Sequence, residues 1–226
     1  AHGKKIALML GIKGAKNEHL LLTDADCKPA DKYWLKGMMQ HFTPDTDIVV
    51  GYGAYEKQKG FLNKIIRFDT FMIALQFLSF ALKRKTYMGT GRNLAYKKSL
   101  FFKLKGFASH YHIESGDDDL FVNEAVNKYN SNVQVNTSNH TISRVKTTLE
   151  EWMNQKRRHI STFANYSSSS KVRLMLLTGS QYLFFATFIA LLILNVGLFL
   201  ILFLFLLRLL IQIIIFKKSM AELGER

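Results

Sequence analysis

The stretch from His19 to Cys27, HLLLTDADC, decides how the rest of the chain is interpreted. Its three leucines form a short apolar run typical of a buried strand, and the run leads directly to Asp24 and Asp26. Residues two apart on an extended segment point the same way, so both carboxylates can emerge at the strand's carboxyl end, where ligands bind in open α/β sheets. Two oxygen donors there suit Mg²⁺ or Mn²⁺ held with a substrate phosphate. The alternative is a polar turn before Pro29.

The last part of the chain is long and apolar enough to predict membrane insertion. Between Leu174 and Phe216 the only residue charged at neutral pH is Arg208. One helix of this length would reach about 65 Å, roughly twice the hydrocarbon thickness of a bilayer. We therefore expect two transmembrane helices within residues 174–216, with a break near residues 195–197. A large buried helical core is the weaker alternative for so continuous a run.

Basic residues at both ends of this segment predict its orientation. They are Lys171 and Arg173 before the first span, and Lys217 and Lys218 after the second. A hairpin places both flanks on one side of the bilayer, and the positive-inside rule makes that side cytoplasmic. We expect an integral membrane protein in which residues 167–173 are a linker and residues 217–226 are a cytoplasmic tail.

The composition limits the compartment and the partners. The chain has 226 residues, with 31 Lys and Arg against 17 Asp and Glu, a net charge of +14. Such a charge points to a polyanion, and an anionic bilayer explains it as well as nucleic acid does in a membrane-anchored chain. The lone cysteine, Cys27, excludes an internal disulfide and fits a reducing compartment. We interpret it as a packing residue, because no basic partner lies nearby in sequence.

Helix-like and strand-like segments alternate before the apolar region, which predicts an α/β fold. The first helix is expected to bury Ile6, Leu8, Met9, Ile12 and Ala15. Because such a sheet does not usually begin with a helix, we expect further strands upstream of Ala1. The apolar segment 71–82 of one helix is too short to span a bilayer and lies either in the membrane interface or in the core. The expected helices cover residues 33–42, 60–85, 97–104, 117–126 and 149–163. The expected strands are residues 20–22, 47–54, a strand that follows the glycine-rich turn within residues 86–96, and two pieces of 132–145.

Three polar stretches follow these elements in order: TDAD at 23–26, SGDDDL at 115–120 and QKRRH at 155–159. Each has a structural alternative. Acids in the first turn of a helix cap free N–H groups and favour the helix dipole, and the bases of QKRRH can form a rim near lipid head groups. His110 and His112 either line a cleft or close a loop, since a zinc site would need further ligands.

In this order, before a membrane hairpin, the three stretches resemble the membrane-bound family 2 glycosyltransferases, the inverting enzymes that include cellulose, chitin and hyaluronan synthases. The sequence around the three stretches is also similar to this family: KKIALMLGI at 4–12, Trp34-Leu35, and GTGRNLAY at 89–96. The resemblance covers nearly the whole chain. It implies a partial GT-A (Rossmann-like) nucleotide-sugar transferase domain over residues 1–166, N-terminally truncated and lacking its first strands, followed by a transmembrane helical hairpin.

The resemblance assigns roles to the acids. Asp24 and Asp26 become the DxD pair that binds Mg²⁺ or Mn²⁺ and the donor diphosphate, with Asp26 as the main metal ligand and Asp24 nearer the nucleotide. An acceptor hydroxyl must lose its proton during attack, and Asp118 matches the family's general base, with Asp117 as its acidic neighbour. Crowded like charges would raise the proton affinity of Asp118. Asp119 falls where the family varies, and we expect it to be a helix cap.

The resemblance also assigns roles to bases. Gln155 and Arg158 match the family's QxxRW motif, which places both at the donor diphosphate, and the planar guanidinium of Arg158 would bind the diphosphate as it leaves. His159 stands where the family has Trp, which puts the stacking role of that position in question although it remains a donor-site residue. Arg92 and His112 are expected on the acceptor side.

The function implied is transfer of a sugar from a UDP- or GDP-sugar to a lipid-linked or saccharide acceptor by a membrane enzyme. The catalytic domain would be cytoplasmic, at a bacterial inner membrane, and nucleic acid is not an expected partner. Two spans argue against a polymer channel in this segment. One alternative is a non-catalytic fragment or membrane scaffold, because the strands that contact the nucleoside are absent. The other is a metal-dependent phosphotransferase or nuclease, which leaves QKRRH and the hairpin unexplained.

Overall fold

The computed structural model describes residues 2–225, and contacts divide them into two compact units. The first unit extends to Tyr166 and includes Glu225, and the second is Ser167–Gly224. The first contains two mixed β-sheets with helices, and the second consists of two apolar helices. The predicted fold class, an α/β domain followed by an apolar helical hairpin, is confirmed.

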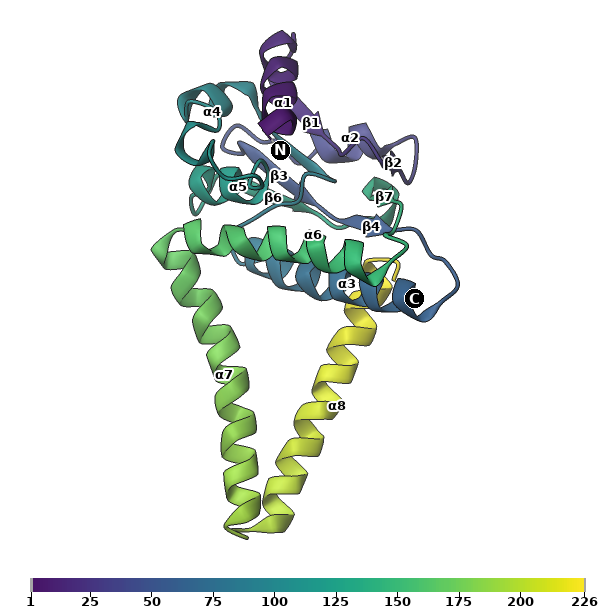
Figure 1. The fold of residues 1–226 in the computed structure, drawn as a ribbon, viewed down its shortest axis with the longest axis vertical. Coiled ribbons are helices and arrows are strands. Elements are labelled where there is room, and N and C mark those ends of the chain that lie inside the picture. The colour runs from purple at the N-terminus through teal and green to yellow at the C-terminus, as the bar shows by residue number, and fades with distance from the viewer. Residues whose placement is uncertain (1, 226) are drawn as a thin grey trace. The chain divides into compact units, whose positions relative to one another are not determined.

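A four-stranded mixed sheet in the order β1-β5-β3-β6 forms the centre of the first unit (Figure 1). The antiparallel pairs are β1 with β5 and β5 with β3, and β3 runs parallel to β6. The strand β3 is central, and its Ile48, Val49 and Val50 are fully buried, as expected of a β-branched run covered on both faces. The strands of this sheet are β1 (His19–Leu22), β3 (Ile48–Gly51), β5 (Leu94–Lys97) and β6 (Ser131–Gln134).

The predicted strand over residues 47–54 is wrong as a single element. It forms β3, which ends at Gly51, and β4, which begins at Gly53 in a different sheet, with the buried Tyr52 between them. Side chains of the GTGRN loop explain the two glycines: a Cβ at Gly51 would lie 2.5 Å from Asn93 Nδ2, and one at Gly53 would lie 2.6 Å from Arg92 Cβ. The second sheet has the order β2-β7-β4, with β2 (Cys27–Pro29), β7 (Thr141–Ser143) and β4 (Gly53–Tyr55).

The helices of the first unit occur close to where the sequence predicts them. The second is shorter than predicted, since it ends at Met39 and the chain continues as a turn. The last predicted helix ends at Ser161 and continues as a tighter 3₁₀ turn. The helices are α1 (His2–Gly14), α2 (Trp34–Met39), α3 (Phe61–Leu82), α4 (Lys98–Lys103), α5 (Asp119–Ala125) and α6 (Leu149–Ser161), with 3₁₀ turns η1 (Ala108–His110), η2 (Thr137–Asn139) and η3 (Thr162–Asn165).

The predicted apolar face of α1 is partly wrong. Ile12 is buried as expected, but Ile6 is 40% exposed and its neighbour Lys5 is only 2% exposed. The Lys5 ammonium donates to the carbonyl oxygens of His110 at 2.6 Å and Ile113 at 2.8 Å. Two charge-assisted hydrogen bonds to backbone carbonyls therefore turn Lys5, rather than Ile6, towards the protein.

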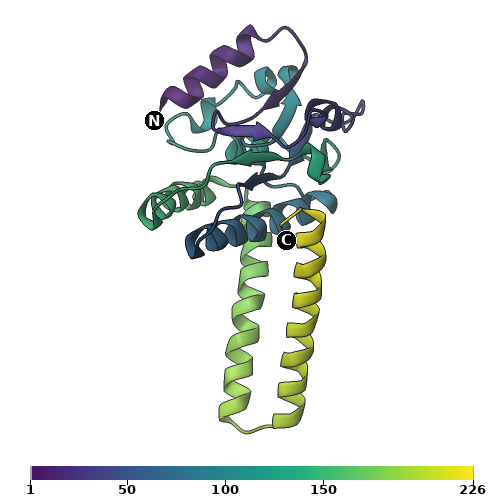
Figure 2. The ribbon, with the colours of Figure 1, turned by 90° about the vertical axis from the view of Figure 1, so that its right-hand side faces the viewer.

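The apolar helix α3 is a core helix on one face. Ile66, Phe71 and Phe77 are fully buried, and the helix contacts β4 and β6. Phe61 and Phe68 on the other face are exposed, so the interfacial interpretation stays open for that face. By length and composition α3 is one of three described helices that could cross a membrane, with 39% of its apolar window buried. The helix α6 lies on the same side of the sheets (Figures 1 and 2).

The second unit is a hairpin of α7 (Ser168–Ile193) and α8 (Leu198–Glu222), both long and apolar enough to cross a membrane. The predicted break near residues 195–197 is confirmed, since Asn195 and Gly197 adopt left-handed backbone conformations there. Most of the predicted linker, residues 168–173, is helical, and so is the predicted tail as far as Glu222. Arg208 on α8 donates to Gln181 on α7, so a charged group within this apolar unit has a partner.

Candidate active site

The DxD turn follows β1 as predicted and brings its two carboxylates together. The Cys27 N–H donates to the Asp24 carbonyl at 3.0 Å, which closes the turn. Ligand atoms of Asp24, Asp26 and Cys27 lie within 4.8 Å of one another. The two carboxylates fit Mg²⁺ or Mn²⁺, whereas the Cys27 thiol is a soft donor and lies 2.8 Å from the Ser143 hydroxyl.

The acidic turn before α5 holds Asp118 firmly. Its Oδ1 accepts the Asp119 N–H at 2.8 Å and its Oδ2 accepts the Gly91 N–H at 2.6 Å. Asp118 is therefore the N-cap of α5, and the expectation that Asp119 is the cap is wrong. The Asp119 carboxylate is buried instead and faces Thr162 and Tyr166.

Lys4 on α1 joins the two acidic turns. Its Nζ lies 2.7 Å from Asp117 Oδ2 and 3.0 Å from Asp24 Oδ1. The GTGRN loop passes the same place, since a Cβ on Gly91 would lie 3.4 Å from Asp118 Oδ2 and 3.5 Å from Asp24 Oδ1. The fold thus gathers aspartates from two distant stretches of sequence around one lysine. Sequence reasoning missed Lys4, because nothing local distinguishes it from Lys5.

The charges in this cluster shift one another's pKa. Burial raises the pKa of Asp118, the charge of Asp119 raises it further, and Lys4 opposes both. Burial, followed by the charge of Asp118, likewise raises the pKa of Asp117. Partial burial lowers the pKa of Lys4, but Asp117, Asp118 and Asp24 outweigh it and raise the pKa overall. The predicted high proton affinity of Asp118 is present, with burial rather than charge crowding as its largest cause.

Arg92 and Gln155 meet at a residue that sequence reasoning also missed, Tyr55 at the end of β4. The Arg92 guanidinium lies over the Tyr55 ring, 4.5 Å from its centroid, and Gln155 Nε2 donates to the Tyr55 hydroxyl at 3.2 Å. Among the described residues, the buried atoms Arg92 Nη1 and Gln155 Oε1 have no hydrogen-bond partner. One unpaired donor and one unpaired acceptor therefore lie near the same ring.

Of the remaining predicted site residues, His159 lies near the acidic turn, whereas Arg158 and His112 are exposed. Partial burial lowers the pKa of His159, Asp118 raises it, and Arg92 and Arg158 lower it, so the imidazole is close to the acidic turn. Arg158 itself is exposed and forms no ion pair with a described residue. His112 is exposed, without a described contact to the acids, whereas the neighbouring His110 is buried and lies 2.9 Å from the Ser109 hydroxyl.

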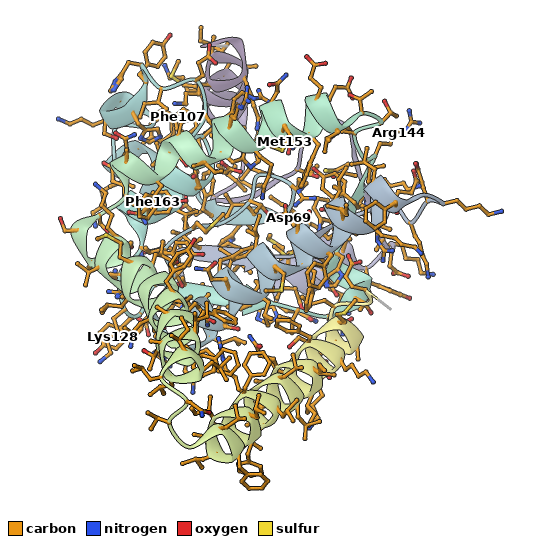
Figure 3. The ribbon with its side chains drawn as sticks, turned by 60° about the horizontal axis from the view of Figure 1, so that its bottom comes forward. Asp69, Phe107, Lys128, Arg144, Met153 and Phe163 are labelled. Carbon is orange, nitrogen blue, oxygen red and sulfur yellow. The ribbon has the colours of Figure 1, made fainter. Side chains whose placement is uncertain are left out.

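Lys156 fastens α6 to α3. Its Nζ lies 2.7 and 2.8 Å from the two carboxylate oxygens of Asp69. Figure 3 labels Asp69 on α3 and Met153 on the neighbouring α6. This ion pair and the Gln155–Tyr55 hydrogen bond turn one face of α6 towards the rest of the unit.

An α/β unit that gathers aspartates from two turns beside a lysine, in a chain with an apolar helical hairpin, fits a membrane-associated transferase. The class becomes specific by comparison with known families: the model described as Glycosyl transferase family 2 matches residues 1–104. Residues 1–104 are therefore similar to family 2 glycosyltransferases, and the resemblance seen in the sequence is confirmed over this part of the chain. The match includes the Asp24 turn and the Arg92 loop, and it ends before the Asp118 turn and α6. A comparison with curated proteins found no match.

Proposed function

We propose that the protein is a membrane-anchored inverting glycosyltransferase that moves a sugar from a nucleotide-sugar donor to a lipid-linked or saccharide acceptor. One observation carries this proposal: Asp24 and Asp117 share Lys4, and a Cβ on Gly91 would lie 3.5 Å from Asp24 Oδ1 and 3.4 Å from Asp118 Oδ2. A donor-binding acid and a base must be this close, because the acceptor attacks the carbon from which the diphosphate leaves.

The donor side is assigned to Asp24 and Asp26, which would hold Mg²⁺ or Mn²⁺. The ion, when bound, neutralises negative charge on the diphosphate leaving group. Lys4 contributes a further positive charge beside Asp24. Arg158 is proposed to contact the diphosphate, and its exposed guanidinium is free of competing ion pairs with described residues.

The base is assigned to Asp118. It takes the proton from the acceptor hydroxyl while the acceptor oxygen forms a bond to the anomeric carbon and the bond to the diphosphate breaks on the opposite face, which inverts the configuration. The N–H groups of Gly91 and Asp119 hold the carboxylate in place, so little reorganisation is needed. Its raised pKa makes it a stronger base than an ordinary aspartate.

The acceptor side is assigned to Arg92, with Asp117 and His112 as auxiliary residues. Gln155 and His159, which the sequence predicts on the donor side, are added to it, because Gln155 shares Tyr55 with Arg92 and His159 lies near Asp118. The unpaired Arg92 Nη1 and Gln155 Oε1 suit a sugar hydroxyl, which donates one hydrogen bond and accepts others. Leaving both unpaired in the bound state would cost free energy, so an acceptor that pairs them is favoured. In this proposal the domain faces the cytoplasm at a bacterial inner membrane, in keeping with the basic flanks of the hairpin.

The test uses the full chain in lipid nanodiscs with Mn²⁺ and a panel of UDP- and GDP-sugars. We expect release of nucleoside diphosphate from one donor, stimulated by a saccharide or lipid-linked acceptor and abolished by chelation of the metal. Absence of both turnover and nucleotide binding across the panel would overturn the proposal in favour of a membrane scaffold.

A further inference from the structure

Asp119 is a buried carboxylate for which the proposed reaction has no use. It directly follows Asp118 and is 7% exposed. An acid so well removed from water is costly unless hydrogen bonds compensate it. The partners that compensate it indicate what it does.

Hydroxyl groups from beyond α6 provide this compensation. Asp119 Oδ1 accepts the Leu120 N–H at 2.8 Å, and Oδ2 accepts the Tyr166 hydroxyl at 2.9 Å. Oδ2 also lies within hydrogen-bonding distance of Thr162 Oγ1, on a residue with no exposed surface. Thr162 Oγ1 also lies 2.7 Å from the His159 carbonyl oxygen, so its single proton is shared between that carbonyl and Asp119. One carboxylate thus joins the start of α5 to the segment that ends α6.

This junction matters because α6 has little else to hold it. None of its 13 residues is buried, so packing alone does not fix its position. Lys156 and Gln155 attach the middle of the helix to Asp69 and Tyr55. At its carboxyl end, Thr162 follows His159 by less than one helical turn, so its contact with Asp119 sets the distance between His159 and the acidic turn.

We propose that Asp119 is a positioning residue that fastens the end of α6 to the acidic turn and so keeps His159 beside Asp118. This inference rests on the proposed role of Asp118 as base. Of the donor-side residues only Arg158 lies on α6 and depends on this junction, whereas Asp24 follows β1 and Lys4 lies on α1.

The charge of Asp119 supplies a readout that a merely structural residue would lack. The charged groups that face Asp118 are Asp119 on α5, Lys4 on α1 and His159 on α6, and Asp117 faces Asp119. Asp119 raises the pKa of Asp118, so its neutralisation lowers that pKa. Because the base must be unprotonated, the acidic limb of the pH profile of kcat/KM then moves to lower pH.

The experiment compares Asp119→Asn, Thr162→Val and the control Thr147→Val, which removes an exposed hydroxyl at the other end of α6. We expect Asp119→Asn and Thr162→Val to lower kcat by about 10- to 100-fold, as for displaced catalytic groups. Nucleoside diphosphate affinity should fall by no more than a few-fold, because Arg158 lies on the loosened helix while Asp24, Asp26 and Lys4 stay in place. Only Asp119→Asn should also move the acidic limb. Asp119→Glu, which keeps the charge, should restore the limb.

Hydrogen exchange separates this inference from the proposed function. In Thr162→Val, amides of α6 should exchange faster than in wild type, while those of α1 and β1 stay unchanged. Wild-type kinetics and exchange in both Thr162→Val and Asp119→Asn would overturn the inference. If the wild-type chain transfers no sugar, the proposed function fails. Unchanged amide exchange of α6 in Thr162→Val would independently refute the proposal that Asp119 fastens the end of α6 to the acidic turn.

Discussion

Replacing Lys4 with Met tests whether one lysine holds the two acidic turns together. Lys4 makes contacts of 2.7 Å to Asp117 and 3.0 Å to Asp24. Breaking a fully buried ion pair costs about 3–5 kcal/mol and an exposed one about 0.2–1 kcal/mol. The Lys4 side chain is 54% exposed and that of Asp117 is 9% exposed, so the value must be discounted towards the exposed case. We expect the first unit to lose roughly 1–2 kcal/mol at neutral pH.

Tryptophan fluorescence during thermal unfolding measures this loss. The two tryptophans, Trp34 and Trp152, both belong to the first unit, so the signal does not report on the hairpin. A loss of 1–2 kcal/mol corresponds to a decrease in Tm of roughly 2–8 °C for a domain of this size. Lys13→Met, an exposed lysine on the same helix, is the matched control and should leave Tm unchanged.

The pH dependence of the same variant has a definite sign. Burial raises the pKa of Asp117 and Lys4 opposes this, so the folded-state pKa of Asp117 rises further without Lys4. A raised carboxyl pKa destabilises the folded state as pH rises from the unfolded-state pKa through the folded-state pKa. The difference between variant and wild type should therefore be largest at neutral pH and shrink on acidification. Equal Tm values for the two proteins between pH 5.5 and 8 would refute the role given to Lys4.

Two further variants test the donor and acceptor sides. Asp26→Ala should weaken Mn²⁺ and nucleotide binding by about tenfold or more, because one of two carboxylate ligands is lost. Calorimetric titration with Mn²⁺ and with UDP or GDP measures the two affinities, and an unchanged metal affinity would remove Asp26 from the donor site. Tyr55→Phe removes the hydroxyl that Gln155 contacts but keeps the ring under Arg92. The KM for the acceptor should therefore rise a few-fold while nucleotide affinity stays constant. A change in nucleotide affinity alone would contradict the acceptor assignment.

Short sequence patterns correctly predicted those features of the fold and the site that depend on neighbouring residues alone. The TDAD turn after β1 and the break at residues 195–197 follow from an apolar run and what interrupts it. Order and spacing of the three polar stretches indicated the family. The division of residues 47–54 into β3 and β4 was not predictable in this way, because it depends on side chains of a loop forty residues away, at Arg92 and Asn93.

The residues that sequence reasoning missed or misassigned act through distant contacts. Lys4 and Lys5 are adjacent and chemically identical, yet one pairs with aspartates and the other donates to carbonyl groups. Asp119 looked like a cap because acids favour helix starts, and its partners lie beyond α6. Periodicity gives the apolar face of a helix, but a buried ammonium with two acceptors can outweigh it, as Lys5 does in α1.

The central claim is that Asp118 is the base of a sugar transfer in a site shared with Asp24. The most direct test is Asp118→Asn in the full chain. An asparagine at this position still caps α5 well, but it cannot take a proton from the acceptor. It keeps one carbonyl oxygen for two N–H donors, so the hydrogen bond from the Gly91 N–H is at risk. Losing that hydrogen bond would cost about 1 kcal/mol of stability. Asp45→Asn, an exposed acid outside the site, is the control. We predict that transfer by Asp118→Asn falls by about 10²- to 10⁴-fold while the nucleoside diphosphate still binds with wild-type affinity. Transfer at the wild-type rate by this variant would contradict the account.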